Sequence, residues 1–229
     1  MRIILKTFSV ISLSLFLSNC STNNDPQTLA ATVPSVSLQT TASDVEKTYT
    51  TVEISGTVDD DGGDPVTAQG TVWSTNASPT INDNSTSESS ASFTSEIENL
   101  EANTTYYFRA YATNAEGTGY SNEESFTTNS LAGTTWDFHV IYSPTQTWHG
   151  DVTFNADGTT VYDEPDYPGI YLTNGTWSLN GNDLTYDFIS SDPGVIIYTG
   201  TLEVNDLSGD LLYAPSHYGT WTAVEYPSL

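Results

Sequence analysis

Basic residues are nearly absent from this 229-residue sequence, which holds four Lys and Arg against 29 Asp and Glu. Such an acidic surface repels nucleic-acid phosphates and anionic lipid headgroups, so we expect no nucleic-acid partner. The acidic residues are spread along the chain and do not gather in one tail. This spread is typical of a surface kept soluble by charge, with an acidic recognition patch as the alternative.

Long hydrophobic runs are also lacking, apart from one near the N-terminus. Arg2 and Lys6 precede a largely apolar run of ten residues, Phe8 to Leu17. A run of ten is too short for a membrane-spanning helix, which needs about 20 residues. Its length and its basic start are typical of an export signal. We therefore predict a signal peptide over residues 1–19.

Cysteine occurs once, at Cys20, directly after this run. The segment Leu17-Ser18-Asn19-Cys20 resembles the lipobox of bacterial lipoproteins, with Asn19 where the family usually has Gly, Ala or Ser. The resemblance implies cleavage before Cys20 and attachment to a membrane through lipid on its thiol. The alternative is an ordinary signal peptide with an incidental or buried cysteine. Ser21 stands where some bacteria use Asp as an inner-membrane retention signal, which favours the outer membrane, facing the periplasm or the cell surface.

The mature chain that this cleavage implies is more acidic than the whole sequence. It keeps two basic residues, Lys47 and Arg109, against 29 acidic ones, a formal net charge of −27. With Cys20 lipidated, no cysteine is left for a disulfide, so folded domains must rely on their packed cores. Residues 20–32 are polar and lack periodicity, and we interpret them as a flexible tether.

Residues 33–128 alternate apolar and polar positions in short runs that are broken by Gly, Asp, Asn and Pro, as β-strands and turns do. The stretch from Leu100 to Tyr106, the strand that follows it to Asn114, and Gly117-Thr118-Gly119 resemble the fibronectin type III domain. The resemblance implies a β-sandwich with a Gly-x-Gly turn and a tyrosine corner, in which the Tyr106 hydroxyl bonds back to the preceding corner.

Residues 131–229 form a second predicted domain of eight strands separated by tight turns. The predicted strands cover residues 135–143, 148–155, 159–163, 174–179, 184–189, 195–204, 207–213 and 218–224. Eight antiparallel strands at this spacing indicate an up-and-down barrel, which leaves no exposed strand edge. An open sandwich of the same strands remains possible. The predicted fold class is thus all-β, a sandwich followed by a barrel.

Three Gly-to-Trp repeats mark the second domain: Gly133-Thr134-Thr135-Trp136, Gly175-Thr176-Trp177 and Gly219-Thr220-Trp221. The first resembles the Gly-x-Trp opening of lipocalins, with one extra residue. The whole domain resembles the short lipocalin-like domains of bacterial lipoproteins. The resemblance implies a barrel that binds a small molecule, although about 99 residues make a shorter barrel than a full lipocalin.

Aromatic residues on the predicted inner face are the candidate ligand-binding residues, because Trp and Tyr combine a large apolar body with a polar group. The candidate residues are Trp148, Trp177, Tyr186, Tyr198 and Trp221. The alternative is that these side chains only fill the interior, as those of a small eight-stranded barrel do.

No catalytic residue, metal site or cofactor is predicted. No Gly-x-Ser-x-Gly elbow or His-x-Glu motif occurs. His139 and His149 could meet across the first hairpin of the barrel, which leaves a two-histidine metal site as an alternative. The acidic run Asp163-Glu164-Pro165-Asp166 is interpreted as an exposed loop, and Asp59 to Asp64 as a turn in preference to a Ca²⁺ loop.

The sequence therefore predicts a non-catalytic, lipid-anchored binding protein whose barrel holds a small apolar molecule or a glycan. A structural or protein-interaction role is the second hypothesis, with recognition of cell-surface proteins by loops such as residues 163–171. A hydrolase that acts on an extracellular polymer is the third hypothesis, with Asp163, Glu164 and Asp166 as its candidate residues.

Overall fold

The computed structural model describes residues 30–166, 169, 173–189, 195–213 and 217–226. Every regular element within these ranges is a β-strand, which confirms the all-β class. The predicted signal peptide, Cys20 and most of the predicted tether lie outside the described residues. In the part of the chain that is described, no helix has the length and apolarity to cross a membrane.

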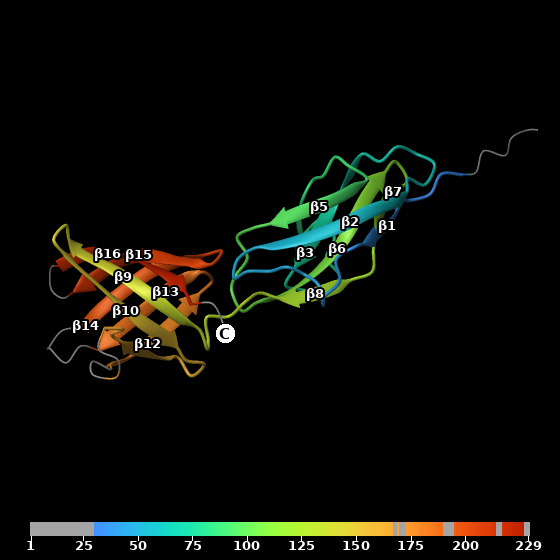
Figure 1. Ribbon diagram of the computed structural model, residues 1–229. Helices are drawn as coiled ribbons and strands as arrows, with labels where there is room; N and C mark the ends of the chain where they lie inside the picture. The colour runs from blue at the N-terminus through green and yellow to red at the C-terminus, as the bar shows by residue number, and fades with distance from the viewer. Residues whose placement is uncertain (1–29, 167–168, 170–172, 190–194, 214–216, 227–229) are drawn as a thin grey trace, which may run out of the picture. The chain divides into compact units, whose positions relative to one another are not determined.

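Strands β1 to β8 build two antiparallel sheets (Figure 1). The first has the order β1-β2-β5, formed by β1 (Ser35–Leu38), β2 (Val52–Asp60) and β5 (Ser92–Ile97). The second has the order β4-β3-β6-β7, and β8 pairs with β6. Its strands are β3 (Ala68–Ser74), β4 (Asn84–Ser85), β6 (Thr105–Asn114), β7 (Gly117–Tyr120) and β8 (Glu124–Thr127).

The two sheets share one apolar core, so they pack face to face as a β-sandwich. Val52, Ile54 and Ile97 contribute from the first sheet, and Phe108 and Phe126 from the second. Strand β6 places alternate side chains in this core because successive residues of a strand point to opposite faces.

The corner before β6 has the predicted geometry. The Tyr106 hydroxyl accepts a hydrogen bond from the Glu101 backbone N–H at 3.0 Å. The segment from Gly117 to Gly119, predicted as a turn, belongs instead to strand β7, and Ala115 and Glu116 form the turn. Gly119 is needed for close approach, because a Cβ there would lie 1.8 Å from the Pro34 carbonyl oxygen.

Strands β9 to β16 form a closed barrel in the order β10-β11-β12-β13-β14-β15-β16-β9, which Figure 1 shows as strands wrapped around a common axis. The strands are β9 (Thr135–Ser143), β10 (Gln146–Phe154), β11 (Thr159–Asp163), β12 (Thr173–Asn180), β13 (Asp183–Ile189), β14 (Val195–Glu203), β15 (Asp206–Tyr213) and β16 (His217–Glu225). All eight predicted strands are confirmed. Pairing of β9 with β16 closes the sheet, so the open-sandwich alternative is wrong.

Alternation along each strand separates the barrel interior from its outer surface. On β9, Trp136, Phe138 and Val140 are buried, whereas His139 and Ile141 are exposed. The buried face belongs to one aromatic-rich core that all eight strands contribute to or contact. The barrel is therefore held together mainly by hydrophobic burial inside one closed sheet.

Candidate functional site

All five predicted ligand-binding residues lie on the inner face of the barrel, but three of them are part of its filled core. Tyr198 is 0% exposed, and Tyr186 and Trp221 are each 1% exposed. The Trp221 ring stacks on Phe138 with centroids 4.8 Å apart, and Tyr186 stacks on Tyr198 at 5.1 Å. These three side chains pack against one another, as the packing alternative expects.

Trp148 and Trp177 are half-buried and lie near opposite ends of the barrel. Trp148 lies near the start of β10, next to the β9–β10 turn. The Trp177 indole N–H donates to the Asn155 carbonyl oxygen at 2.9 Å, in the turn that follows β10. Because the nine residues of β10 separate these turns, the two indoles cannot contact one small ligand together.

A second aromatic group, which the sequence pattern does not mark as a unit, surrounds Trp148. We call Tyr142, Trp148, Tyr162 and Phe188 the rim cluster. Trp148 lies 6.2 Å from Tyr142 and 5.4 Å from Tyr162, between ring centroids. The Tyr162 and Phe188 centroids are 5.2 Å apart. Tyr142, Trp148 and Phe188 are half-buried, so solvent reaches aromatic surface at this end of the barrel.

Two buried phenols, Tyr186 on β13 and Tyr198 on β14, lie next to each other in the barrel core. Among the residues that the structure describes, neither the Tyr186 nor the Tyr198 hydroxyl makes a well-formed hydrogen bond, although the Thr160 hydroxyl lies beside the first and the Tyr142 hydroxyl beside the second. Burial raises the pKa of both phenols, so both stay neutral. An unpaired buried hydroxyl costs about 1–3 kcal/mol, so each is a group that a polar atom of a ligand could stabilise.

The rim cluster also carries a phenol that stays protonated. Burial, and then the nearby carboxylate of Glu164, raises the pKa of Tyr162 to about 12. At neutral pH, the rim cluster therefore offers apolar ring faces and the neutral hydroxyl of Tyr162, with acidic groups nearby. This chemistry suits an apolar or hydroxyl-rich neutral molecule better than an anion.

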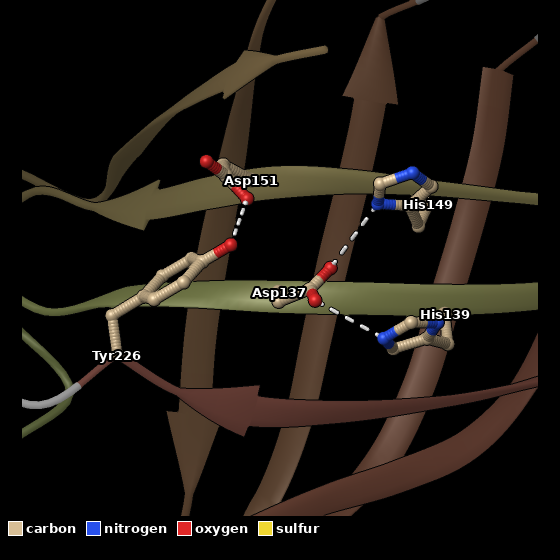
Figure 2. Close-up of polar contacts among 5 residues, drawn as sticks. All are labelled: Asp137, His139, His149, Asp151 and Tyr226. Carbon is tan, nitrogen blue, oxygen red and sulfur yellow. Dashed lines mark hydrogen bonds and ion pairs between the residues drawn. The ribbon is translucent and has the colours of Figure 1, made fainter. Parts of the chain in front are cut away.

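The outer surface of the barrel holds a different group of side chains, on β9, β10 and the residue after β16 (Figure 2). His139 and His149 are directly paired across the hairpin, and their rings stack with centroids 5.8 Å apart, which confirms that the two histidines meet. Asp137 lies between them. Its Oδ2 is 3.1 Å from His139 Nε2, and its Oδ1 is 3.7 Å from His149 Nδ1.

Asp151 occupies the next position of the same surface. Its carboxylate accepts a hydrogen bond from the Tyr226 hydroxyl at 3.0 Å (Figure 2). The strand register places Asp151 directly opposite both Asp137 on β9 and Asp163 on β11. Desolvation and these two like charges raise the pKa of Asp151, although the bond from Tyr226 opposes the shift. This row of three carboxylates is therefore unfavourable for folding at neutral pH.

Replacement of Asp151 by Asn is expected to stabilise the protein at neutral pH. The folded-state pKa of Asp151 is raised, so its unfavourable contribution is absent at low pH and appears as the pH rises through that pKa. Asn does not ionise and can still accept the Tyr226 hydrogen bond. We expect a gain of a few tenths of a kcal/mol at pH 7 that shrinks on acidification, measured by thermal melts from pH 3 to 8.

Asp157→Asn is the matched control for this measurement. Hydrogen bonds from Thr159 lower the pKa of Asp157, the opposite direction to Asp151. The same substitution there is expected to lower the melting temperature at pH 7, with the difference lost as the pH falls. A lower melting temperature for Asp151→Asn at pH 7 would show that the carboxylate row is not repulsive.

The remaining acidic candidates lie at the end of β11 and in the loop that follows it. Asp163 Oδ1 accepts a hydrogen bond from the Gly169 backbone N–H at 2.9 Å, and Asp166 is exposed. Part of the predicted recognition loop 163–171 lies outside the described residues. Of the predicted turn from Asp59 to Asp64, the first two residues end strand β2 and the turn follows them. Asp60 and Asp61 accept bonds from the Gly62 and Gly63 backbone N–H groups. This use of the carboxylates supports the turn interpretation.

No protein-family model matches this chain, and no curated protein is significantly similar to it. The features that bear on function are therefore the geometry of the barrel, the rim cluster and the charged group on the outer surface of the barrel.

Proposed function

We propose that this chain is a lipid-anchored bacterial protein whose barrel binds a small apolar molecule or a glycan at the rim cluster, without catalysing a reaction. The fibronectin III-like sandwich then acts as a spacer between the tether and the lipocalin-like barrel. One observation carries the binding proposal: aromatic rings are half-exposed at the rim cluster, whereas the interior side chains around Phe138 are fully buried.

The chemistry of the rim cluster supports this class of ligand. Half-buried Trp and Tyr rings can be covered by an apolar molecule or by the apolar face of a sugar, with their polar atoms still available for hydrogen bonds. The neutral, unpaired hydroxyls of Tyr186 and Tyr198 favour a ligand with a polar atom at its inner end. The high density of acidic residues disfavours an anionic ligand.

Native mass spectrometry of residues 21–229, after exposure to an extract of the source organism, tests the proposal. We expect a reproducible added mass that is lost in Trp148→Ala. Trp177→Ala is the matched control, because it removes another half-buried indole, near the opposite end of the barrel. An added mass lost equally in both variants would move the site away from the rim cluster. A bare protein across several extracts would reject ligand binding.

The anchor that we propose is lipid on Cys20, in the outer membrane and facing the periplasm or the cell surface. The support is the signal-like run before Cys20 and the absence of any other cysteine in the sequence. Metabolic labelling with a radioactive fatty acid tests it. The wild-type chain should be labelled and sediment with membranes, and Cys20→Ser should be unlabelled and leave the membrane fraction.

A protein-interaction role is the second candidate, and the filled barrel core favours it. Tyr186, Tyr198 and Trp221 are buried against neighbouring rings, as in a barrel that is structural. Recognition would then fall to loops such as residues 163–171. This candidate gains support if the mass-spectrometry experiment finds no ligand and a cell-surface protein crosslinks to that loop.

A further inference from the structure

The two stacked histidines on the outer face of the barrel are its most unusual polar feature. Residues 131–229 contain no Lys or Arg but 13 Asp and Glu, so histidines are the only side chains of the barrel that can become cationic. Two of them are direct cross-strand neighbours with a carboxylate between them (Figure 2). Imidazole is also a good ligand for transition metals.

The Asp137 carboxylate provides a second, independent observation. Within the described ranges, Asp137 Oδ1 is buried and has no hydrogen-bond partner, although it lies 3.7 Å from His149 Nδ1. A buried carboxylate oxygen without a partner is costly, and a cation at this position would satisfy it. This oxygen therefore has the 3.7 Å contact with the His149 imidazole but no hydrogen bond.

We propose that Asp137, His139 and His149 form a surface site for a divalent transition-metal ion such as Zn²⁺. The site is separate from the proposed ligand site, because it lies on the outer face of β9 and β10 whereas the rim cluster lies on the inner face. The outcome of a metal-binding test therefore does not affect the function proposed for the rim cluster.

Each imidazole already lies close to the Asp137 carboxylate. Ligand atoms about 2.1 Å from a tetrahedral Zn²⁺ lie about 3.4 Å from one another. The His139 Nε2 to Asp137 Oδ2 distance of 3.1 Å and the His149 Nδ1 to Asp137 Oδ1 distance of 3.7 Å lie on either side of that value, but they involve different carboxylate oxygens, so a ring must move before both imidazoles share one ion. The set of two imidazoles and one carboxylate leaves the remaining coordination positions to water.

Binding requires the two rings to turn. No three His, Cys, Asp or Glu side chains of the described residues are already gathered around one point as metal ligands. The His139 and His149 side chains are 58% and 44% exposed, so rotation about their side-chain torsions meets little resistance. Asp137, at 26% exposed, is the more fixed ligand around which they can close.

The charge and chemistry of the surroundings select the ion. The acidic barrel attracts any cation, and Asp151 adds a carboxylate opposite Asp137. Imidazole nitrogen, however, prefers Zn²⁺, Cu²⁺ or Ni²⁺, whereas Ca²⁺ and Mg²⁺ prefer oxygen ligands. A site that depends on both histidines is therefore expected to discriminate against Ca²⁺.

Isothermal titration of ZnCl₂ into tag-free residues 21–229 at pH 7.5 tests the site. We expect saturable binding of Zn²⁺ that is at least tenfold weaker in His139→Gln and in His149→Gln. His217→Gln, at the third histidine of the barrel, should bind Zn²⁺ like the wild type. In NMR spectra, Zn²⁺ should shift the ring resonances of His139 and His149 before any others. The melting temperature of each variant without metal confirms that it is folded.

Three results would overturn the proposal. The first is no saturable binding of Zn²⁺ at millimolar concentration. The second is an equal loss in His217→Gln, which would place the ion elsewhere. The third is binding of Ca²⁺ as tight as that of Zn²⁺, which would indicate attraction to carboxylates without the imidazoles.

Discussion

Phe138→Ala is expected to lower the free energy of unfolding by about 3–5 kcal/mol, the range for loss of a large aromatic side chain from a packed core. Phe138 is 0% exposed. Its ring lies within 6.2 Å, between centroids, of Phe154, Tyr186, Tyr198 and Trp221. Removing the ring leaves a cavity in the centre of the barrel that four aromatic neighbours cannot fill without leaving their rotamers.

A loss of this size is a large fraction of the stability of a typical domain. The measurement is urea unfolding followed by tryptophan fluorescence. Four of the five tryptophans belong to the barrel, so this signal reports mainly on it.

Ile141→Ala is the matched control on the same strand. Ile141 is 49% exposed on the outer face, so its removal should cost much less than the loss of Phe138. Phe138→Leu, which keeps most of the apolar volume, should fall between the two. If Phe138→Ala costs no more than Ile141→Ala, the barrel interior is not packed as described, and a water-filled or ligand-filled interior becomes the better interpretation.

The strands and their buried faces could be predicted from the sequence because both depend on local patterns. Alternation with a period of two places Trp136, Phe138 and Val140 on one face, and the structure buries all three. Turn residues such as those from Asn155 to Gly158 mark where the strands end. The predicted and observed strand bounds in the barrel therefore agree within two residues.

The sequence predicts a barrel but could not exclude an open sandwich, nor could it give the position of each side chain along the barrel axis, because both depend on contacts between distant segments. Closure depends on the pairing of β9 with β16, at opposite ends of the domain sequence. Alternation tells which face Trp148 and Trp177 occupy, but the register of the whole barrel decides that they lie near opposite ends. Because this register is not visible in the sequence, the predicted five-residue site combines residues from different positions along the barrel axis.

The charged group on the outer surface could be predicted in part. The meeting of His139 and His149 follows from one hairpin, and their positions on either side of a short turn are enough to predict it. The same register places Asp137 opposite Asp151, as the structure confirms. The further pairing of Asp151 with Asp163 requires the register of a second hairpin. The burial that raises the pKa of Asp151 also depends on the folded structure, so it could not be predicted from the sequence.

Gly150→Ala is expected to destabilise the protein by about 1–3 kcal/mol, the usual cost of overpacking a core. A Cβ at Gly150 would lie 1.9 Å from Tyr162 Cε2 and 2.6 Å from its hydroxyl oxygen. The Tyr162 ring is 8% exposed and lies between Trp148 and Phe188, so it cannot move aside without disturbing the rim cluster. Equilibrium unfolding in urea measures the loss.

A double-mutant cycle with Tyr162→Leu shows whether this ring is the cause. Leucine is too short to reach the position of Tyr162 Cε2, so the clash disappears in that background. Alanine is a better strand residue than glycine by about 0.5–1 kcal/mol, and Gly150→Ala should therefore become neutral or stabilising once Tyr162 is Leu. The sign of the effect should thus reverse between the two backgrounds. An unchanged cost would assign the role of Gly150 to the backbone. A reversal of sign would show that Gly150 is the residue that lets the Tyr162 ring lie against the sheet. Gly150→Ala should then also weaken the ligand binding proposed for the rim cluster.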